Sequence, residues 1–213
     1  MKKIILILAA VAVSLAASAQ PDFKPISEPE LTIIKNNIKA KNTEIQTLIC
    51  PFVQTKKMAV LKENAVTKGI MYFAKPNRFR WEYIGENPFI FVQNGGKYFT
   101  KANGKVTEIK DNSARLFQEI SRLVISSING EILENNKRFK IEFQENNSMV
   151  VVNLTPTQKA MQNFMSKIKL YFNKATYLVS KIEIYESGND VTIIQFENVK
   201  VNQTINDDIF ILK

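Results

Sequence analysis

The chain of 213 residues contains no histidine and a single cysteine, Cys50. Without imidazole there is no Ser-His-Asp triad and no Cys-His pair, and zinc sites built on histidine or on several cysteines are excluded. One cysteine forms no internal disulfide, so the core must be held by burial alone. The seven glycines form no phosphate-binding loop. These absences argue against an enzyme and predict neither a cofactor nor a metal.

The first twenty residues, MKKIILILAAVAVSLAASAQ, have the layout of a secretory signal peptide. Two lysines precede an apolar run that is short for a membrane span, and Ala17-Ser18-Ala19 follows as a cleavage site. We expect residues 1–19 to be removed and residues 20–213 to form one mature domain. The alternative is an anchor helix that is retained.

The net charge of the chain is +9, and two of these charges belong to the lysines of the signal peptide. The mature chain would therefore carry +7. The charges are spread along the expected strands, which favours a solvated outer face over a surface that steers the protein toward acidic partners or anionic lipids. Export and the inward position expected for the rings argue against nucleic acid as a partner.

Aromatic residues alternate with charged ones in the stretch KPNRFRWEY. In a strand, Phe79, Trp81 and Tyr83 would share one face, and the charged residues between them would share the other. Residues 137–144 and 167–172 show the same alternation. Such rings usually form a core, and the alternative is that they line a ligand cavity.

Two segments have the apolar spacing of amphipathic helices, 27–41 and 113–128. Ser27 and Glu30 predict a capping box at the start of the first. About ten strands surround the helices in antiparallel order, and we therefore expect a mainly β (α+β) domain. A meander of this length with one apolar face curls into a barrel or half-barrel, with the helices as its cover.

Several blocks resemble the periplasmic outer-membrane lipoprotein carrier family, LolA. They are FVQTKK (52–57), GIMYFAKPNRFRWEY (69–83), FVQNGGKYFTK (91–101) and NLTPTQ (153–158), followed by a run of strands and a closing strand, DIFILK, with a terminal phenylalanine. The resemblance implies a single-domain unclosed antiparallel β-barrel, covered by helices that form a lid over a hydrophobic cavity.

The resemblance also implies a non-catalytic job in the periplasm of a Gram-negative bacterium. A monomeric carrier would take the acyl chains of lipoproteins released by an inner-membrane ATP-driven exporter and hand them to an outer-membrane acceptor. Two other readings remain open for the same fold. One is a carrier of a different amphiphile, such as a glycolipid, and the other is a lipid-responsive sensor domain.

Phe79 and Trp81 match the F-x-W strand of the family, and we expect both to face the cavity. Cys50 is expected to be a small buried apolar residue among its neighbours. The residues expected to line the acyl-chain cavity are Phe52, Ile70, Tyr72, Phe79, Trp81, Tyr83, Phe91, Phe139, Ile141, Phe143, Leu170 and Phe172.

Lys75 stands where the family often has an arginine before proline, a position tied to cargo handover and lid closure. Lysine keeps the charge but loses the planar fork of donors. The segment 155–167 is interpreted as a mobile flap, or as a surface loop that tucks Phe164 into the core. The residues expected in the lid are Leu116, Phe117, Ile120, Met161, Phe164 and Met165.

Signal-peptide cleavage is directly testable on the exported protein. We expect N-terminal sequencing to begin at Gln20, because Ala17-Ser18-Ala19 presents small residues to the peptidase. Exported protein that still begins at Met1 would contradict this assignment.

Overall fold

The structure is a computed structural model that describes residues 22–61, 63–110, 115–128, 131–134 and 137–213. The expected signal peptide lies outside the described residues. None of the helices within the described ranges is both long and apolar enough to cross a membrane.

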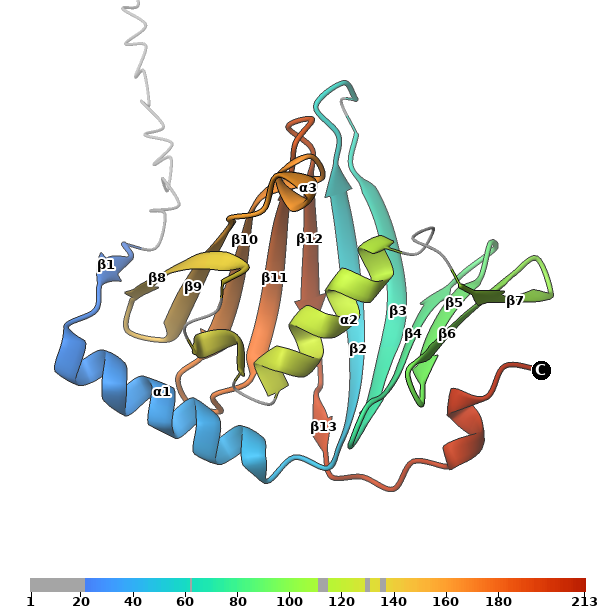
Figure 1. The fold of residues 1–213 in the computed structure, drawn as a ribbon, viewed down its shortest axis with the longest axis horizontal. Coiled ribbons are helices and arrows are strands. Elements are labelled where there is room, and N and C mark those ends of the chain that lie inside the picture. Colours follow the sequence, from blue (N-terminus) through green and yellow to red (C-terminus); the bar gives the residue numbers. More distant parts are fainter. Residues whose placement is uncertain (1–21, 62, 111–114, 129–130, 135–136) are drawn as a thin grey trace, which may run out of the picture.

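The elements are mostly strands, joined by short turns (Figure 1). In chain order they are β1 (Lys24–Pro25), α1 (Glu28–Thr43), β2 (Thr47–Lys57), β3 (Ala65–Ala74), β4 (Arg78–Ile84), β5 (Phe89–Asn94), β6 (Lys97–Ala102), β7 (Lys105–Ile109), α2 (Arg115–Ile128), η2 (Glu131–Leu133), β8 (Phe139–Glu145), β9 (Met149–Pro156), α3 (Lys159–Gln162), β10 (Met165–Asn173), β11 (Val179–Glu186), β12 (Val191–Phe196), β13 (Lys200–Val201) and η3 (Asp207–Phe210).

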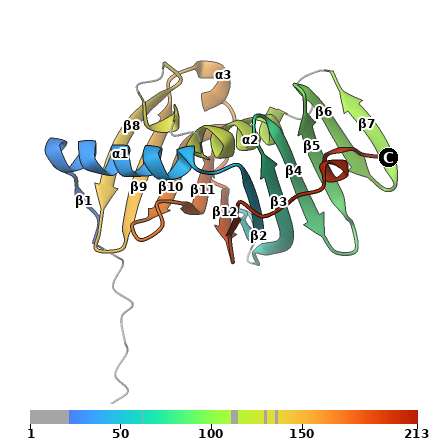
Figure 2. The same cartoon turned by 90° about the horizontal axis from the view of Figure 1, so that it is seen from below.

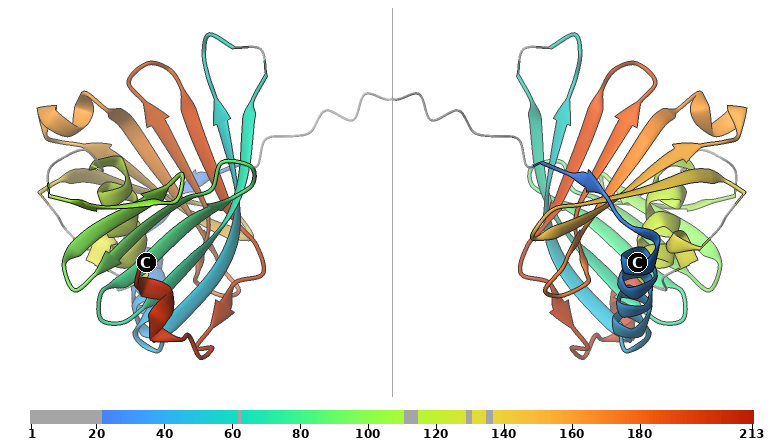
Figure 3. Two further views of the ribbon diagram at one scale, coloured as in Figure 1. Left: turned by 90° about the vertical axis from the view of Figure 1, so that its right-hand side faces the viewer. Right: turned by 90° about the vertical axis from the view of Figure 1, so that its left-hand side faces the viewer.

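All thirteen strands belong to one antiparallel sheet that curls without closing (Figure 3). Its order is β1-β8-β9-β10-β11-β12-β2-β3-β4-β5-β6-β7, and β13 pairs with β2. The predicted unclosed antiparallel barrel is confirmed. The strand count exceeds the expected ten partly because β1 and β13 have two residues each, too few to show any alternation.

Two helices lie against the concave side of this sheet, hereafter the inner face (Figure 2). Helix α2 crosses it in front of β11, β12, β2 and β3, while α1 runs along the lower ends of β8 to β11 (Figure 1). Ser27 is the N-cap of α1 as predicted, but its side chain makes no capping hydrogen bond, so the capping box is wrong. Glu28 and Glu30 instead place negative charge in the first turn, where the helix dipole favours it.

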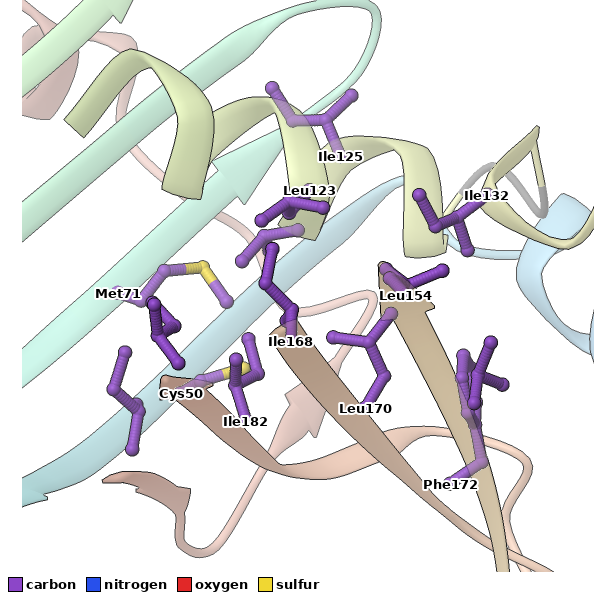
Figure 4. Packing of buried hydrophobic residues seen from close by; sticks show 14 of the residues in the cluster. Cys50, Met71, Leu123, Ile125, Ile132, Leu154, Ile168, Leu170, Phe172 and Ile182 are labelled. Atoms are coloured by element: carbon purple, nitrogen blue, oxygen red, sulfur yellow. The ribbon is translucent and has the colours of Figure 1, made fainter. Parts of the chain in front are cut away.

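The main core lies between the inner face and these helices (Figure 4). Helix α2 buries Leu123, Val124 and Ile125 in it, and α1 buries Ile34 and Ile38. In Figure 4, Leu123 lies between α2 and Ile168 of β10. Helix α2 is thus attached to the sheet mainly by apolar contact, which is non-directional and roughly proportional to buried area.

The C-terminal segment, predicted to be a closing strand, instead forms the short helix η3 and covers part of the opposite, outer face. Phe210 is buried there against Ala74 and Val92. Arg80 donates to the Ile209 carbonyl over 2.9 Å and forms a two-point contact with Glu82. The outer face of β3 to β6 is therefore a second, smaller core.

Gly69 of β3 leaves room for an aromatic ring from the neighbouring strand to lie over its backbone. It pairs with Phe52 of β2 and Tyr83 of β4. A Cβ atom at this position would collide with the Phe52 ring and with the Glu82 carbonyl oxygen. Glycine is used here because the ring lies directly over the backbone.

We expect Gly69→Ala to lower the free energy of unfolding by about 1–3 kcal/mol, because the Phe52 ring and the β3–β4 pairing would have to shift. Urea denaturation measures the effect. Gly188→Ala is the matched control, since nothing lies within 4 Å of the added Cβ atom. Equal stability of the two variants would contradict the close approach at Gly69.

Candidate functional site

An aromatic cluster occupies the inner face of β2, β4 and β5. The Phe52 and Trp81 ring centroids lie 4.1 Å apart, and Tyr83 meets Phe52 edge-on at 5.7 Å. Phe79 and Phe91 contact each other at 6.4 Å from the neighbouring strands. All five were expected to line the cavity, and the strand pairing puts all five on the inner face.

The other half of the inner face is aliphatic and aromatic. Phe139, Ile141 and Phe143 of β8 pair with inward positions of β9, and Leu170 and Phe172 of β10 continue the same surface. Phe139, Leu170 and Phe172 are buried, whereas Ile141 and Phe143 are half-buried at the sheet's end. The inner face is therefore apolar from β8 to β5.

The prediction that Ile70 and Tyr72 line the cavity is wrong. Because Gly69 lies opposite Phe52, the inward residues of β3 are Gly69, Met71 and Phe73. Ile70 and Tyr72 point outward, and Tyr72 packs against the second core under the C-terminal segment. In the run GIMYF the residues on both faces of the strand are apolar, so the sequence pattern does not show which of them point inward. The pairing with Phe52 was the signal that would have identified Met71 and Phe73.

The inner face becomes polar toward one end of β2. Inward positions along this strand run from Leu48, Cys50 and Phe52 to Gln54 and Lys56. The inward side chains of β2 thus change along the strand from an apolar core to a polar boundary on the same face.

Hydrogen bonds connect this polar boundary. The Tyr83 hydroxyl donates to Gln54 Oε1 over 2.8 Å. Lys56 Nζ lies 3.0 Å from Glu186 Oε2 and 3.7 Å from Asp190 Oδ2. Among the described residues, no three His, Cys, Asp or Glu side chains are grouped so as to hold a metal ion.

One polar atom of the aromatic cluster lacks a partner. Burial raises the pKa of Tyr83 above its ordinary value, and the neighbouring Trp81 indole and Gln54 amide lower it in part. Trp81 Nε1 is itself buried, and although its nearness to the Tyr83 oxygen lowers that pKa, neither this oxygen nor another acceptor among the described residues lies in hydrogen-bonding geometry to it. An unsatisfied buried donor costs roughly 1–3 kcal/mol.

Among its described side chains, helix α2 has few polar attachments to the rest of the protein, one of them the 2.6 Å ion pair of Glu119 with Arg138. Ser121 Oγ donates to Gln93 Oε1 over 3.1 Å, and Asn42 Nδ2 of α1 donates to the Ser127 carbonyl over 2.9 Å. The expected lid residues Leu116, Phe117 and Ile120 belong to this helix, but their side chains lie outside the described part of the structure.

The segment expected to be a flap contains the short helix α3, which connects β9 to β10 at the top of the sheet in Figure 1. Met161 and Met165 belong to the main core. Phe164 is 55% exposed, so the alternative in which it tucks into the core is wrong. Its main-chain carbonyl accepts from Ser187 of the β11–β12 turn over 3.2 Å.

Lys75 binds a helix end. Its Nζ donates to the Thr43 carbonyl of α1 over 2.9 Å, where a cation is favoured by the helix dipole. This contact connects the β3–β4 turn to α1. A single donor performs it, which agrees with the limited geometry of a lysine at this position.

A small cavity lies between α2, α1 and the sheet. Its volume is ≈ 30 Å³, and its walls include Cys50, Val124, Ser127 and Phe172. Ligand pockets usually measure about 300–1,000 Å³. Helix α2 is therefore closed over this part of the inner face.

An unclosed sheet with a continuous apolar inner face under a covering helix is typical of proteins that enclose apolar molecules. The family profile described as outer membrane lipoprotein carrier protein LolA matches residues 43–213. The chain belongs to this family, which is named for carrying and not for catalysis.

Curated relatives carry the same description. The chain is similar to the outer-membrane lipoprotein carrier protein of Francisella tularensis subsp. tularensis strain WY96-3418, with 29% identity over 175 residues, 82% of this chain and 80% of the relative. The protein of that name from subsp. novicida strain U112 is 28% identical over 172 residues, 81% of this chain and 78% of the relative.

Solved structures with a similar course of the chain include a LolA superfamily protein from Nitrosomonas europaea, with a TM-score of 0.43, 12% identity and coverage of 84% of this chain and 97% of the other. The Mycobacterium tuberculosis lipoprotein LppX aligns with a TM-score of 0.46 and 12% identity, over 84% of this chain and 99% of its own.

Cys50 is buried, as predicted, and reports on the position of α2. Burial raises the pKa of its thiol to about 12, so little of the reactive thiolate exists at pH 8. We expect slow labelling by a thiol reagent, and labelling about fivefold faster in Asn42→Ala, which loses the bond to Ser127.

The matched control for this experiment is Asn37→Ala on the same helix. Asn37 donates to the Tyr177 hydroxyl and makes no hydrogen bond to α2 within the described part of the chain. Urea denaturation of each variant separates local opening from global unfolding. Equal labelling rates in both variants would show that Asn42 does not hold α2 closed.

Proposed function

We propose that this protein is exported and carries lipoproteins across the periplasm by enclosing their acyl chains between α2 and the inner face. The observation that supports this most is the continuous apolar inner face beneath a helix held mainly by apolar contact. Phe52, Phe79, Trp81 and Phe91 would form the floor of the site, and Leu123 and Val124 would belong to its cover.

The energetics of this task favour a site that is closed when empty. Burying one CH₂ group contributes about 0.8 kcal/mol, so a 16-carbon chain would gain on the order of 12 kcal/mol if fully enclosed. A preformed open cavity would hold such a chain too tightly to release it. When cargo enters, it replaces α2 on the same surface, and only the difference between the two burials remains as affinity.

The relatives' description supports lipoproteins as the cargo. A carrier of this kind needs a donor at the inner membrane, which we propose is an ATP-driven exporter, and an acceptor at the outer membrane. The signal-like N-terminus supports a periplasmic location. Catalysis has no part in the proposal, since burial and release of apolar surface suffice.

Native mass spectrometry of the protein purified gently from its own host tests the cargo. We expect a one-to-one complex with an acylated lipoprotein. A bound glycolipid or other free lipid would instead assign the same site to a different amphiphile. A stable membrane-protein partner without cargo would contradict transport and favour a sensor.

The single tryptophan gives a second test of the site. Because Trp81 lies on the inner face, we expect acyl chains brominated along their length to quench its fluorescence on contact. The matched control is the same amphiphile without bromine, which binds but lacks the heavy-atom quencher. Binding without bromine-dependent quenching would place the chains elsewhere on the protein.

A further inference from the structure

The unpartnered indole of Trp81 points to a more specific role for the inner face. We infer that Trp81, Tyr83 and Gln54 form a subsite for the acyl carbonyl of the cargo, with Trp81 Nε1–H donating to the carbonyl oxygen. The inference rests on the proposed function, since it describes how a bound acyl group is oriented. The acyl carbonyl can belong to an ester or to an amide.

The donor itself supports a ligand with a neutral acceptor. Trp81 Nε1 is buried, and the Tyr83 oxygen near it lies outside hydrogen-bonding geometry, as does every other acceptor among the described residues. Indole nitrogen is a donor only, so protein or ligand must supply the acceptor. A carbonyl oxygen does this at little cost, whereas an anion would lose its hydration in a ring of Phe52, Phe79 and Phe196.

The charged residues around this subsite are already paired, which favours a neutral ligand group beside Trp81. Lys56 is the nearest inward cation along β2, and it is already paired with Glu186 and Asp190. Thr192 Oγ1 also donates to Glu186, over 2.9 Å. A carboxylate or phosphate group would have to compete with these contacts for Lys56, while a carbonyl beside Trp81 leaves them intact.

The polarity of the inner face sets the direction of the ligand. On β4 the inward residues run from Phe79 through Trp81 to Tyr83, and on β2 from Phe52 to Gln54 and Lys56. Both strands become polar toward the same end, as the hydrogen bond between the Tyr83 hydroxyl and Gln54 across β3 shows. The hydrocarbon would therefore extend toward Phe79, and the hydrophilic part of the cargo toward Lys56.

The subsite is closed in the structure, since the Trp81 side chain is almost fully buried. An acyl group reaches it only when the cover over the inner face moves. In the closed form the indole donor is unsatisfied, and in the loaded form it is bonded. The hydrogen bond therefore favours the loaded form, and it depends on the carbonyl and not on chain length.

Two ligands that differ only in the carbonyl test the inference: dioctanoylglycerol and its dioctyl ether analogue. The exported protein, purified without cargo and labelled with ¹⁵N, has one indole Nε1–H signal because it has one tryptophan. We expect the ester to shift this signal downfield and the ether to leave it near its unbound position. We also expect the ester to bind about 2- to 10-fold more tightly.

Variants identify the donor. In Trp81→Phe, which keeps a ring but lacks the N–H group, the ester-to-ether affinity ratio should fall to about one. Phe79→Leu is the matched control on the same strand. It should weaken both ligands alike and leave the ratio unchanged, because Phe79 has no polar atom. A dioctanoyl analogue with amide linkages shows whether the preferred carbonyl is that of an ester or of an amide.

The outcomes separate this inference from the proposed function. If ester, amide and ether bind equally and the indole signal does not distinguish them, the subsite is wrong while the acyl-chain carrier stands. If none of the ligands binds, both fail. A carbonyl preference that persists in Trp81→Phe would also overturn the inference, because another donor would then be responsible. The wild-type spectra answer the question even if a variant fails to fold.

Discussion

Apolar surface on the concave side of an unclosed sheet must be covered, and most of the structure follows from this requirement. The inner face is apolar from β8 to β5, and water contact with it is unfavourable. Helix α2 covers it across the central strands, while α1 closes its lower end (Figure 1). The outer face of β3 to β6 has the same requirement on a smaller scale, which Phe210 and the C-terminal segment meet.

In the function proposed above, the same burial would let a carrier without its own energy source both hold and release cargo. Under the proposed function, cargo and α2 would use one surface, so binding would exchange one apolar contact for another. The aromatic floor around Phe52 and Trp81 is held by the sheet, while α2 has few polar attachments to it. The polar boundary formed by Tyr83, Gln54 and Lys56 adds direction to an otherwise non-directional interaction.

Much of the fold could be predicted where the two faces of a strand differ in chemistry. Phe79, Trp81 and Tyr83 alternate with charged residues, and the structure places them inward as expected. The prediction failed at Ile70 and Tyr72, because both faces of β3 are apolar there. The outer side of Tyr72 is covered by a segment more than 130 positions away, which no local pattern of β3 reveals.

The sequence by itself determined the strands, the two long helices, the orientation of the amphipathic strands and the absence of imidazole chemistry, because periodicity and composition are local properties of the chain. Tertiary structure alone decided the register that brings Phe52 over Gly69 and Tyr83 against Gln54. It also decided where α2 lies and which donor stays unsatisfied. These features depend on pairing between distant segments, whose energies are set by burial and hydrogen bonding across the whole sheet.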